Sequence, residues 1–158
     1  MYSSTSKKSS SSSCGPGRKP TLFAGTIKKI SIYGNGLIAG GIIFGTHHVL
    51  VVLEIDGAAE SRKFILLEVE RCENGKINIH METGSTESSV VDRRANRDDA
   101  AKYWKSDSVN AKTSVVQSVI DNYHESTYDA VLKSCRTFVD TICKECGSDK
   151  KFSEWVLW

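Results

Sequence analysis

The chain has 158 residues, of which 39% are hydrophobic and 25% are charged, and this is enough to bury the core of one globular domain. Its 21 basic and 19 acidic residues leave a formal net charge of +2, so no electrostatic preference for nucleic acid or for an anionic membrane surface is indicated. We therefore expect a single domain that does not bind nucleic acid.

The first twenty residues are built mainly from serine, glycine and lysine. They contain no apolar stripe that could dock on a core, so ordering them would cost conformational entropy without burying surface in return. We expect residues 1–20 to form a disordered serine-rich tail and residues 21–158 to form one α+β domain.

Cysteine content and hydropathy bear on the cellular compartment. The five cysteines are odd in number and irregularly spaced, and no basic start followed by an apolar stretch marks a signal peptide. The most apolar window, residues 36–55, is interrupted by four glycines, two histidines and a glutamate, so it falls short of the ~18 to 20 apolar residues of a membrane span. We expect a cytoplasmic protein with free thiols and without a transmembrane segment.

Strand signals dominate the part of the chain that follows the tail. Residues 26–45, TIKKISIYGNGLIAGGIIFG, have the composition of one or two short strands with a Gly-Asn-Gly turn. Three apolar runs separated by turn residues then predict an antiparallel meander with strands near 46–55, 62–72 and 76–82. The Asn-Gly pair at 74–75 favours a two-residue hairpin turn between the last two strands.

These turns set an expected register for the meander. A two-residue loop at positions 74–75 places Glu68 opposite Met81, and a first loop centred near Ala58 places His48 opposite Glu68. Residues that share a face of the sheet follow from this register, and we expect the helices to pack on the apolar face that carries both polar residues. That face comprises His48, Leu50, Val52, Phe64, Leu66, Glu68, Ile79 and Met81.

The C-terminal half changes from strands to helices. Residues 83–110 are polar and charged, and we expect a mobile surface loop there. Apolar residues then recur on one helical face between Val115 and Tyr123, and a second helix follows from Cys135. Strands followed by helices predict an α+β fold in which an antiparallel β-meander packs against C-terminal helices.

The second helix begins at a cysteine. Unpaired amide groups and the positive end of the helix dipole stabilise a thiolate in the first turn, which makes Cys135 a candidate nucleophile. A buried structural cysteine is the alternative interpretation. The apolar stripe of this helix consists of Cys135, Phe138, Val139, Ile142, Cys143 and Cys146.

A thiol nucleophile needs a neighbouring base and a polar group that orients the base. His47 and His48 open the first meander strand, and adjacent strand residues point to opposite faces, so only one of them can face the helix of Cys135. The expected register selects His48 as the base and Glu68 as its polar partner. A satisfied core pair is the alternative, and a slip of one residue in the register would move both side chains outward.

No motif for a metal or a cofactor has a complete spacing. CKEC at 143–146 lies inside the amphipathic helix without a second Cys/His pair at zinc-ligand spacing. GNG at 34–36 and AGG at 39–41 lack the spacing of a dinucleotide or phosphate loop, so turns or bulges are the simpler explanation. We therefore expect no cofactor and no bound metal.

A histidine that opens a meander strand, a polar partner on the next strand and a cysteine that begins a later helix resemble the circularly permuted papain-like enzymes. HHVLVVLEIDG resembles the strand and turn of the lecithin:retinol acyltransferase-like family. YDAVLKSCRTFVDTI resembles the pattern of tyrosine, leucine, Asn-Cys, x, x, Phe that this family and the PPPDE peptidases both use, although Ser134 replaces the usual asparagine. The resemblance implies a permuted papain-like fold with Cys135 as nucleophile, His48 as base and Glu68 as orienting residue.

The resemblance also implies a cysteine-dependent acyl-transfer enzyme, either a thiol hydrolase or an acyltransferase. Its substrate would be an acyl ester, thioester or amide, carried by a lipid or by a modified protein. Two alternatives stay open, namely a PPPDE-like isopeptidase that removes a protein modifier and a catalytically inactive interaction domain of the same fold. In either enzyme the segment 83–110 is the expected substrate-facing element.

Overall fold

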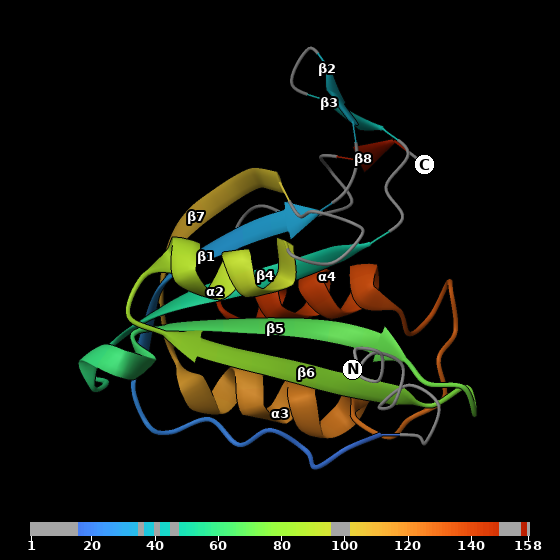
Figure 1. Cartoon of the computed structure of the whole chain (residues 1–158), viewed down its shortest axis with the longest axis horizontal. Coiled ribbons are helices and arrows are strands. Elements are labelled where there is room, and N and C mark those ends of the chain that lie inside the picture. The colour runs from blue at the N-terminus through green and yellow to red at the C-terminus, as the bar shows by residue number, and fades with distance from the viewer. Residues whose placement is uncertain are drawn as a thin grey trace, which may run out of the picture.

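An antiparallel sheet of five strands forms the centre of the computed structural model, which describes residues 16–34, 37–39, 42–44, 48–95, 102–148 and 156–157 (Figure 1). The strands lie across this sheet in the order β6-β5-β4-β1-β7, and each neighbouring pair is antiparallel. Their bounds are β1 Thr26–Gly34, β4 Val49–Asp56, β5 Phe64–Arg71, β6 Ile77–Gly84 and β7 Lys102–Lys112. The predicted meander is confirmed as β4, β5 and β6, and β1 and β7 extend it.

A smaller sheet and a short 3₁₀ helix accompany the large sheet. Strands β2 (Leu37–Ala39), β3 (Ile42–Phe44) and β8 (Val156–Leu157) lie in this order, and β8 runs parallel to β3. The 3₁₀ helix η2 (Glu60–Arg62) connects β4 to β5. Residues 26–45 therefore contribute three strands, β1 to β3, where the sequence predicts one or two.

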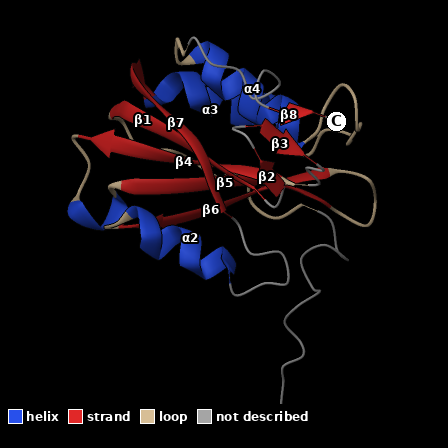
Figure 2. Ribbon diagram, turned by 90° about the horizontal axis from the view of Figure 1, so that it is seen from above, coloured by secondary structure: helices blue, strands red, loops and turns tan. Residues whose placement is uncertain are grey.

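Helices cover both faces of the large sheet (Figure 2). α3 (Thr113–Tyr123) and α4 (Cys135–Glu145) pack together on one face, and α2 (Glu87–Ala95) packs on the other. This arrangement confirms the α+β class. Within the described ranges, no helix has both the length and the apolar character needed to cross a membrane.

Each face of the sheet has its own apolar core, and strand alternation decides which residues enter it. Val51 and Leu53 of β4 point into the core beneath α3 and α4. Leu50 and Val52 point to the opposite face, where α2 covers them. The prediction that the face of Leu50 and Val52 receives the helix of Cys135 is therefore wrong. Because β4 is buried on both faces, its continuous apolar run does not indicate which face packs against which helix.

The hairpin between β5 and β6 differs by one residue from the predicted register. Glu68 lies opposite His80, not opposite Met81. The loop has three residues, because Cys72 N donates to Lys76 O at 2.8 Å and Gly75 adopts a left-handed φ of 83°. Glycine is also favoured at the last position of a three-residue loop, so the Asn-Gly pair does not by itself distinguish the two turns.

The pairing of β4 with β5 differs from the predicted register by two residues. Leu50, not His48, lies opposite Glu68. A hydrogen bond of 2.8 Å from Ile55 N to Lys63 O centres the connecting loop one position later than predicted. An even shift keeps every side chain on its face, so Glu68 stays on the face of Leu50.

Residues 83–110 contain regular elements, so the prediction of a mobile surface loop is wrong. β6 continues to Gly84, α2 follows at Glu87–Ala95, and β7 begins at Lys102. Among the described strands, β7 lies at the edge of the sheet with β1 as its neighbour. Edge strands tolerate polar and charged residues, so β7 has no apolar pattern from which the sequence could predict it.

The last five residues of the segment predicted as a disordered tail, residues 16–20, contact the folded domain. Residues 1–15 lie outside the described residues, whereas residues 16–20 run past β6 and α3. The Gly17 N–H donates to Asn78 Oδ1 at 2.9 Å, and the Gly17 carbonyl lies 2.8 Å from His124 Nε2. Pro20 is buried. Ordered contacts therefore begin before the predicted boundary at residue 21.

Candidate active site

Cys135 is the first residue of α4, and the cap of the helix fixes its position. Ser134 has an extended backbone, and its Oγ accepts the N–H of Thr137 at 3.4 Å. In return, Thr137 Oγ1 accepts the N–H of Ser134 at 2.8 Å, which completes a capping box. The Cys135 thiol therefore lies at the positive end of the helix dipole.

Tyr123, the last residue of α3, anchors this helix start. Its hydroxyl donates to Thr137 Oγ1 at 2.8 Å, and its ring packs edge-on against Phe138 with 5.2 Å between the centroids. Tyr123 and Phe138 are both buried. Because Thr137 is also the capping partner of Ser134, this contact links the placement of α3 to the placement of the thiol.

His48 precedes β4 and contacts both other candidate residues. Its Nε2 hydrogen-bonds to Glu68 Oε2, and its ring also hydrogen-bonds to the Cys135 thiol. The structure therefore brings Cys135, His48 and Glu68 together in one connected triad. The alternative base, His47, lies outside the described residues.

The triad joins groups that belong to different faces of the sheet. Cys135 is part of the core beneath α3 and α4, whereas Glu68 shares its strand face with Leu66, which packs against α2. His48 connects the two because it lies one residue before the first residue of β4. Strand alternation does not govern a side chain outside the strand, so the predicted strand face does not explain why His48 reaches Cys135.

The electrostatics of the site favour a thiolate beside an imidazolium. Burial raises the pKa of the Cys135 thiol, but the hydrogen bond and charge of His48, the backbone N–H of Val49 and the charge of Arg136 together lower it. Burial disfavours the charged form of His48, yet hydrogen bonds to Cys135 and Glu68 raise its pKa to about 10. The lowered pKa of the thiol and the raised pKa of the imidazole both favour the ion pair over the neutral pair.

Glu68 occupies a buried position in the middle of the sheet. Its side chain is 7% exposed, and β5 carries it between Leu50 of β4 and His80 of β6. A buried carboxylate is costly unless it is paired, and the His48 imidazolium supplies the pairing. The same contact holds the imidazole ring in one orientation.

Solvent reaches the triad at His48, whose side chain is 34% exposed, whereas Cys135 is 4% exposed. Tyr128 lies near the sulfur: burial and the charge of Cys135 raise the pKa of its hydroxyl. The Arg71 guanidinium lies 5.6 Å from the centroid of the Tyr128 ring. Tyr128 therefore keeps its proton at neutral pH and borders the site as a neutral side chain.

The segment before Cys135 forms a tight turn with an exposed apolar tip, which consists of Val131 and Leu132. Asp129 Oδ1 accepts the N–H groups of both residues at 2.9 Å, and Asp129 exchanges two backbone hydrogen bonds with Lys133. The two residues of the apolar tip are 77% and 76% exposed. The turn therefore holds two aliphatic groups in water next to the start of α4.

The other described cysteines differ from Cys135. Cys72, Cys143 and Cys146 are buried and free. Burial, with the charge of nearby acidic groups, raises the pKa of Cys143 to about 12 and that of Cys146 to about 11, and burial also raises the pKa of Cys72. These thiols stay protonated at neutral pH. In the part of the chain that the structure describes, no group of three or more His, Cys, Asp or Glu side chains is placed to hold a metal ion.

The remaining described histidines have hydrogen-bond partners other than Cys135. His124 Nδ1 accepts the N–H of Ile79 at 3.1 Å, and His80 Nε2 lies 2.7 Å from Glu82 Oε2. Sequence reasoning missed the support from Tyr123 and the apolar tip. The serine and threonine three residues apart at 134 and 137 were a usable capping signal, whereas no sequence pattern marks the tip as exposed.

No family model, curated protein or solved structure matches this chain. A functional assignment therefore depends on the geometry of the site itself.

Proposed function

We propose that the protein is a cysteine-dependent acyl-transfer enzyme of the circularly permuted papain-like type, a thiol hydrolase or acyltransferase. Cys135 is the nucleophile, His48 the base, and Glu68 the residue that orients and stabilises the imidazolium. The observation that carries the proposal is the connected contact from the Cys135 thiol, at a capped helix start, through His48 to Glu68.

The first half-reaction forms an acyl-enzyme. The Cys135 thiolate attacks the carbonyl carbon of an ester, thioester or amide, and an electron pair moves to the carbonyl oxygen. Amide N–H groups at the start of α4 stabilise the resulting oxyanion. When the tetrahedral intermediate collapses, the bond to the leaving group breaks and the His48 imidazolium donates its proton to that group.

The second half-reaction releases the acyl group. Neutral His48 accepts a proton from water, or from an acceptor hydroxyl or amine, as that nucleophile attacks the Cys135 thioester. The carbon–sulfur bond breaks, and the thiolate and the imidazolium are restored. Glu68 stabilises the positive charge on His48 in both half-reactions.

The apolar tip favours a substrate with an apolar acyl group over a polar isopeptide. Val131 and Leu132 lie four and three residues before the nucleophile, and about three quarters of the surface of each is exposed. Covering them with an alkyl chain removes apolar surface from water, at about 0.8 kcal/mol per buried methylene of the chain. We therefore place acyl esters first and modifier-linked isopeptides second.

Activated esters of two chain lengths test the reaction and its preference together. We expect p-nitrophenyl octanoate to give a burst of nitrophenolate and an octanoyl adduct on Cys135 in mass spectra. We expect p-nitrophenyl acetate to react more slowly under the same conditions. Leu132→Ser should reduce the preference for octanoate and leave the acetate rate unchanged, since Leu132 does not belong to the triad.

Cys135→Ser and Cys146→Ser form a matched pair of thiol variants. Cys135→Ser should abolish the burst, and Cys146→Ser should keep it because that thiol is protonated and lies at the other end of α4. Labelling of Cys135 by a protein modifier with a C-terminal propargylamide, without ester turnover, would instead support the isopeptidase. Inertness of Cys135 to both probes refutes the enzyme and leaves the interaction domain.

A further inference from the structure

Strand β6 forms one edge of the large sheet, and residues 124–126 hydrogen-bond to the backbone of its first half (Figure 1). The backbone groups of Ile77 point away from β5: its N–H donates to Ser126 O and its carbonyl accepts from Glu125 N, each at 2.8 Å. Two residues later, the Ile79 N–H donates to His124 Nδ1 at 3.1 Å. Odd-numbered residues of β6 therefore direct their backbone groups to the outer edge.

Among the described residues, this edge is open at Met81, the next odd-numbered position. The same alternation places the N–H and C=O of Met81 on the outer side. Among the described residues, neither of these Met81 groups has a hydrogen-bond partner. A free donor and acceptor on a sheet edge are a template for an added strand.

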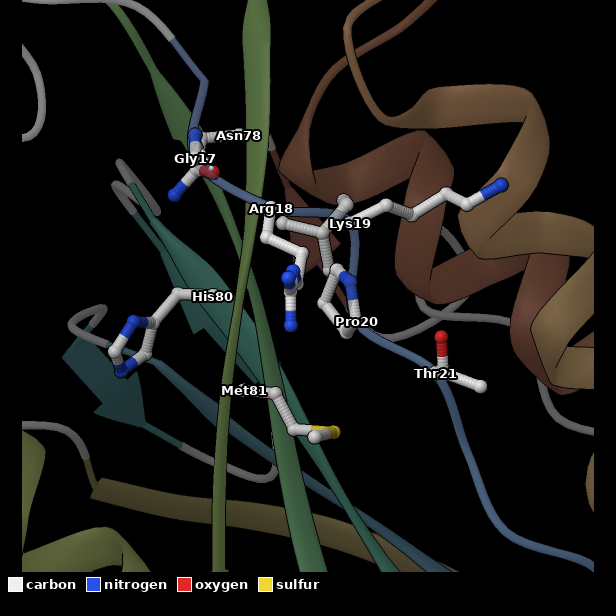
Figure 3. Close-up of a pocket in the computed structure, with 9 residues that line it drawn as sticks. Gly17, Arg18, Lys19, Pro20, Thr21, Asn78, His80 and Met81 are labelled. Carbon is white, nitrogen blue, oxygen red and sulfur yellow. Dashed lines mark hydrogen bonds between the residues drawn. The ribbon is translucent and has the colours of Figure 1, made fainter.

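A pocket of about 500 Å³ lies beside this open edge (Figure 3). Residues 17–21 form one wall and residues 78–81 form the other. The first wall is fixed to α3, because Leu22 N donates to Gln117 Oε1 at 2.7 Å and Gln117 Nε2 donates to Pro20 O at 3.1 Å. The volume falls in the range of pockets that bind ligands, so it is large enough to take side chains of a bound segment.

Arg18 supplies the positive charge of the pocket. Figure 3 shows its side chain extending along β6 toward Met81. The other basic side chains of the lining are paired, Lys19 with Asp121 at 3.0 Å and His80 with Glu82 at 2.7 Å. Within the described ranges, Arg18 makes no ion pair. A planar guanidinium binds a carboxylate through two parallel hydrogen bonds, so a carboxylate is the group that this pocket fits best.

We propose that the open edge of β6 and this pocket bind an extended, carboxylate-bearing peptide segment of a partner protein. The main chain of the peptide pairs with the N–H and C=O of Met81 as an added strand, and its carboxylate binds Arg18. The carboxylate comes from an acidic side chain or from the C-terminus of the peptide. The proposal does not depend on the chemistry of Cys135.

Three fluorescein-labelled hexapeptides separate these sources in an anisotropy titration. The first, Thr-Val-Thr-Glu-Val-Thr-amide, has only a side-chain carboxylate. The second has glutamine in place of glutamate and a free C-terminus, and the third has glutamine and an amidated C-terminus. We expect at least one of the first two to bind with a Kd below about 1 mM, and the third to bind at least tenfold more weakly.

Arg18 and Lys19 provide a matched pair of variants for the carboxylate contact. Arg18→Gln should remove the difference between the carboxylate peptides and the third peptide. Lys19→Gln should preserve that difference, because Lys19 is already paired with Asp121. Equal effects of the two substitutions, or equal binding of all three peptides, contradict the assignment of Arg18.

Amide hydrogen exchange tests the strand pairing. Exchange at Met81 should slow at least tenfold when the bound peptide is present. Met81→Pro should abolish binding without breaking the β5 ladder, since the Met81 N–H points outward. If that variant does not fold, the exchange measurement on the native chain decides.

Absence of binding by all peptides, or binding without protection of Met81, overturns the proposal. Concentration-dependent dimers that protect Met81 without peptide also overturn it and assign the edge to a second copy.

Discussion

Replacement of His48 by alanine removes the strongest influence that lowers the pKa of the Cys135 thiol. The hydrogen bond and the positive charge of His48 are lost together, while burial, which raises the pKa, is retained. The N–H of Val49 and the charge of Arg136 are the weaker lowering influences that remain. We expect the thiol pKa to rise to at least the free-cysteine value of about 8.5.

The size of the effect follows from the fraction of thiolate. A thiol with a pKa of about 8.5 is roughly 3% ionised at pH 7, which alone reduces its alkylation rate about thirtyfold from that of a fully ionised thiol. A thiolate of higher pKa is intrinsically more nucleophilic, and this offsets part of the loss. The net expectation for His48→Ala is a decrease of about tenfold or more at pH 7, and this decrease should shrink as the pH rises toward and beyond the raised pKa of the thiol.

Iodoacetamide labelling at a series of pH values measures this effect, with quantification of the Cys135 peptide by mass spectrometry. His80→Ala is the control, because His80 pairs with a glutamate but does not contact Cys135. An unchanged pH profile in His48→Ala would refute the role of His48. If His47→Ala produces the shift instead, the base is the neighbouring histidine and Glu68 loses its assigned role.

Three further predictions concern the ion pair and the helix start. The raised pKa of His48 and the lowered pKa of Cys135 make the contribution of the pair to stability depend on pH. On the acid side the unfolded thiol takes up its proton before the folded one, so the stabilisation by the thiolate is lost as the pH falls through the lowered pKa of Cys135. On the alkaline side, between about pH 9 and 10, the folded His48 keeps a proton that the unfolded chain has lost, so stability decreases as the pH rises. Urea unfolding of the wild type and of the His48→Ala/Cys135→Ala double variant measures this difference, and a difference that does not decrease between about pH 9 and 10 contradicts the ion pair. Glu68→Gln keeps the side-chain shape but removes its charge, so labelling of Cys135 at pH 7 should fall between that of the wild type and that of His48→Ala. A loss as large as that of His48→Ala would indicate that Glu68 holds the fold of the site instead. Ser134→Ala removes the acceptor of the Thr137 N–H and should lower the free energy of unfolding by about 1 kcal/mol, whereas Ser134→Asn should preserve it; equal stabilities of the two variants argue against the cap.

The sequence by itself determined the elements whose signals are local. The apolar stripe from Cys135 to Cys146 predicts α4 and places a thiol in its first turn, because helical periodicity and capping depend on residues within a few positions of each other. Three apolar runs predict β4, β5 and β6 for the same reason. These parts of the fold and the candidate nucleophile therefore follow from neighbours in the chain.

The tertiary structure decided the registers, the faces and the strands at the edges. One residue more in the loop at Gly75 moves Glu68 from Met81 to His80, and a turn of either length fits the local residues. The polar strand β7 forms because β1 offers it a free edge to pair with, which no local pattern reveals.

The site depends on both kinds of information. Its residue types were visible in the sequence, but the contact of His48 with Glu68 and Cys135 was expected from a strand face that α2 covers instead. The three residues meet because His48 lies just before β4. At this position the start of β4, the middle of β5 and the start of α4 come together. Such a contact joins segments far apart in the chain, so it is set by the packing of the helices on the sheet and not by local periodicity.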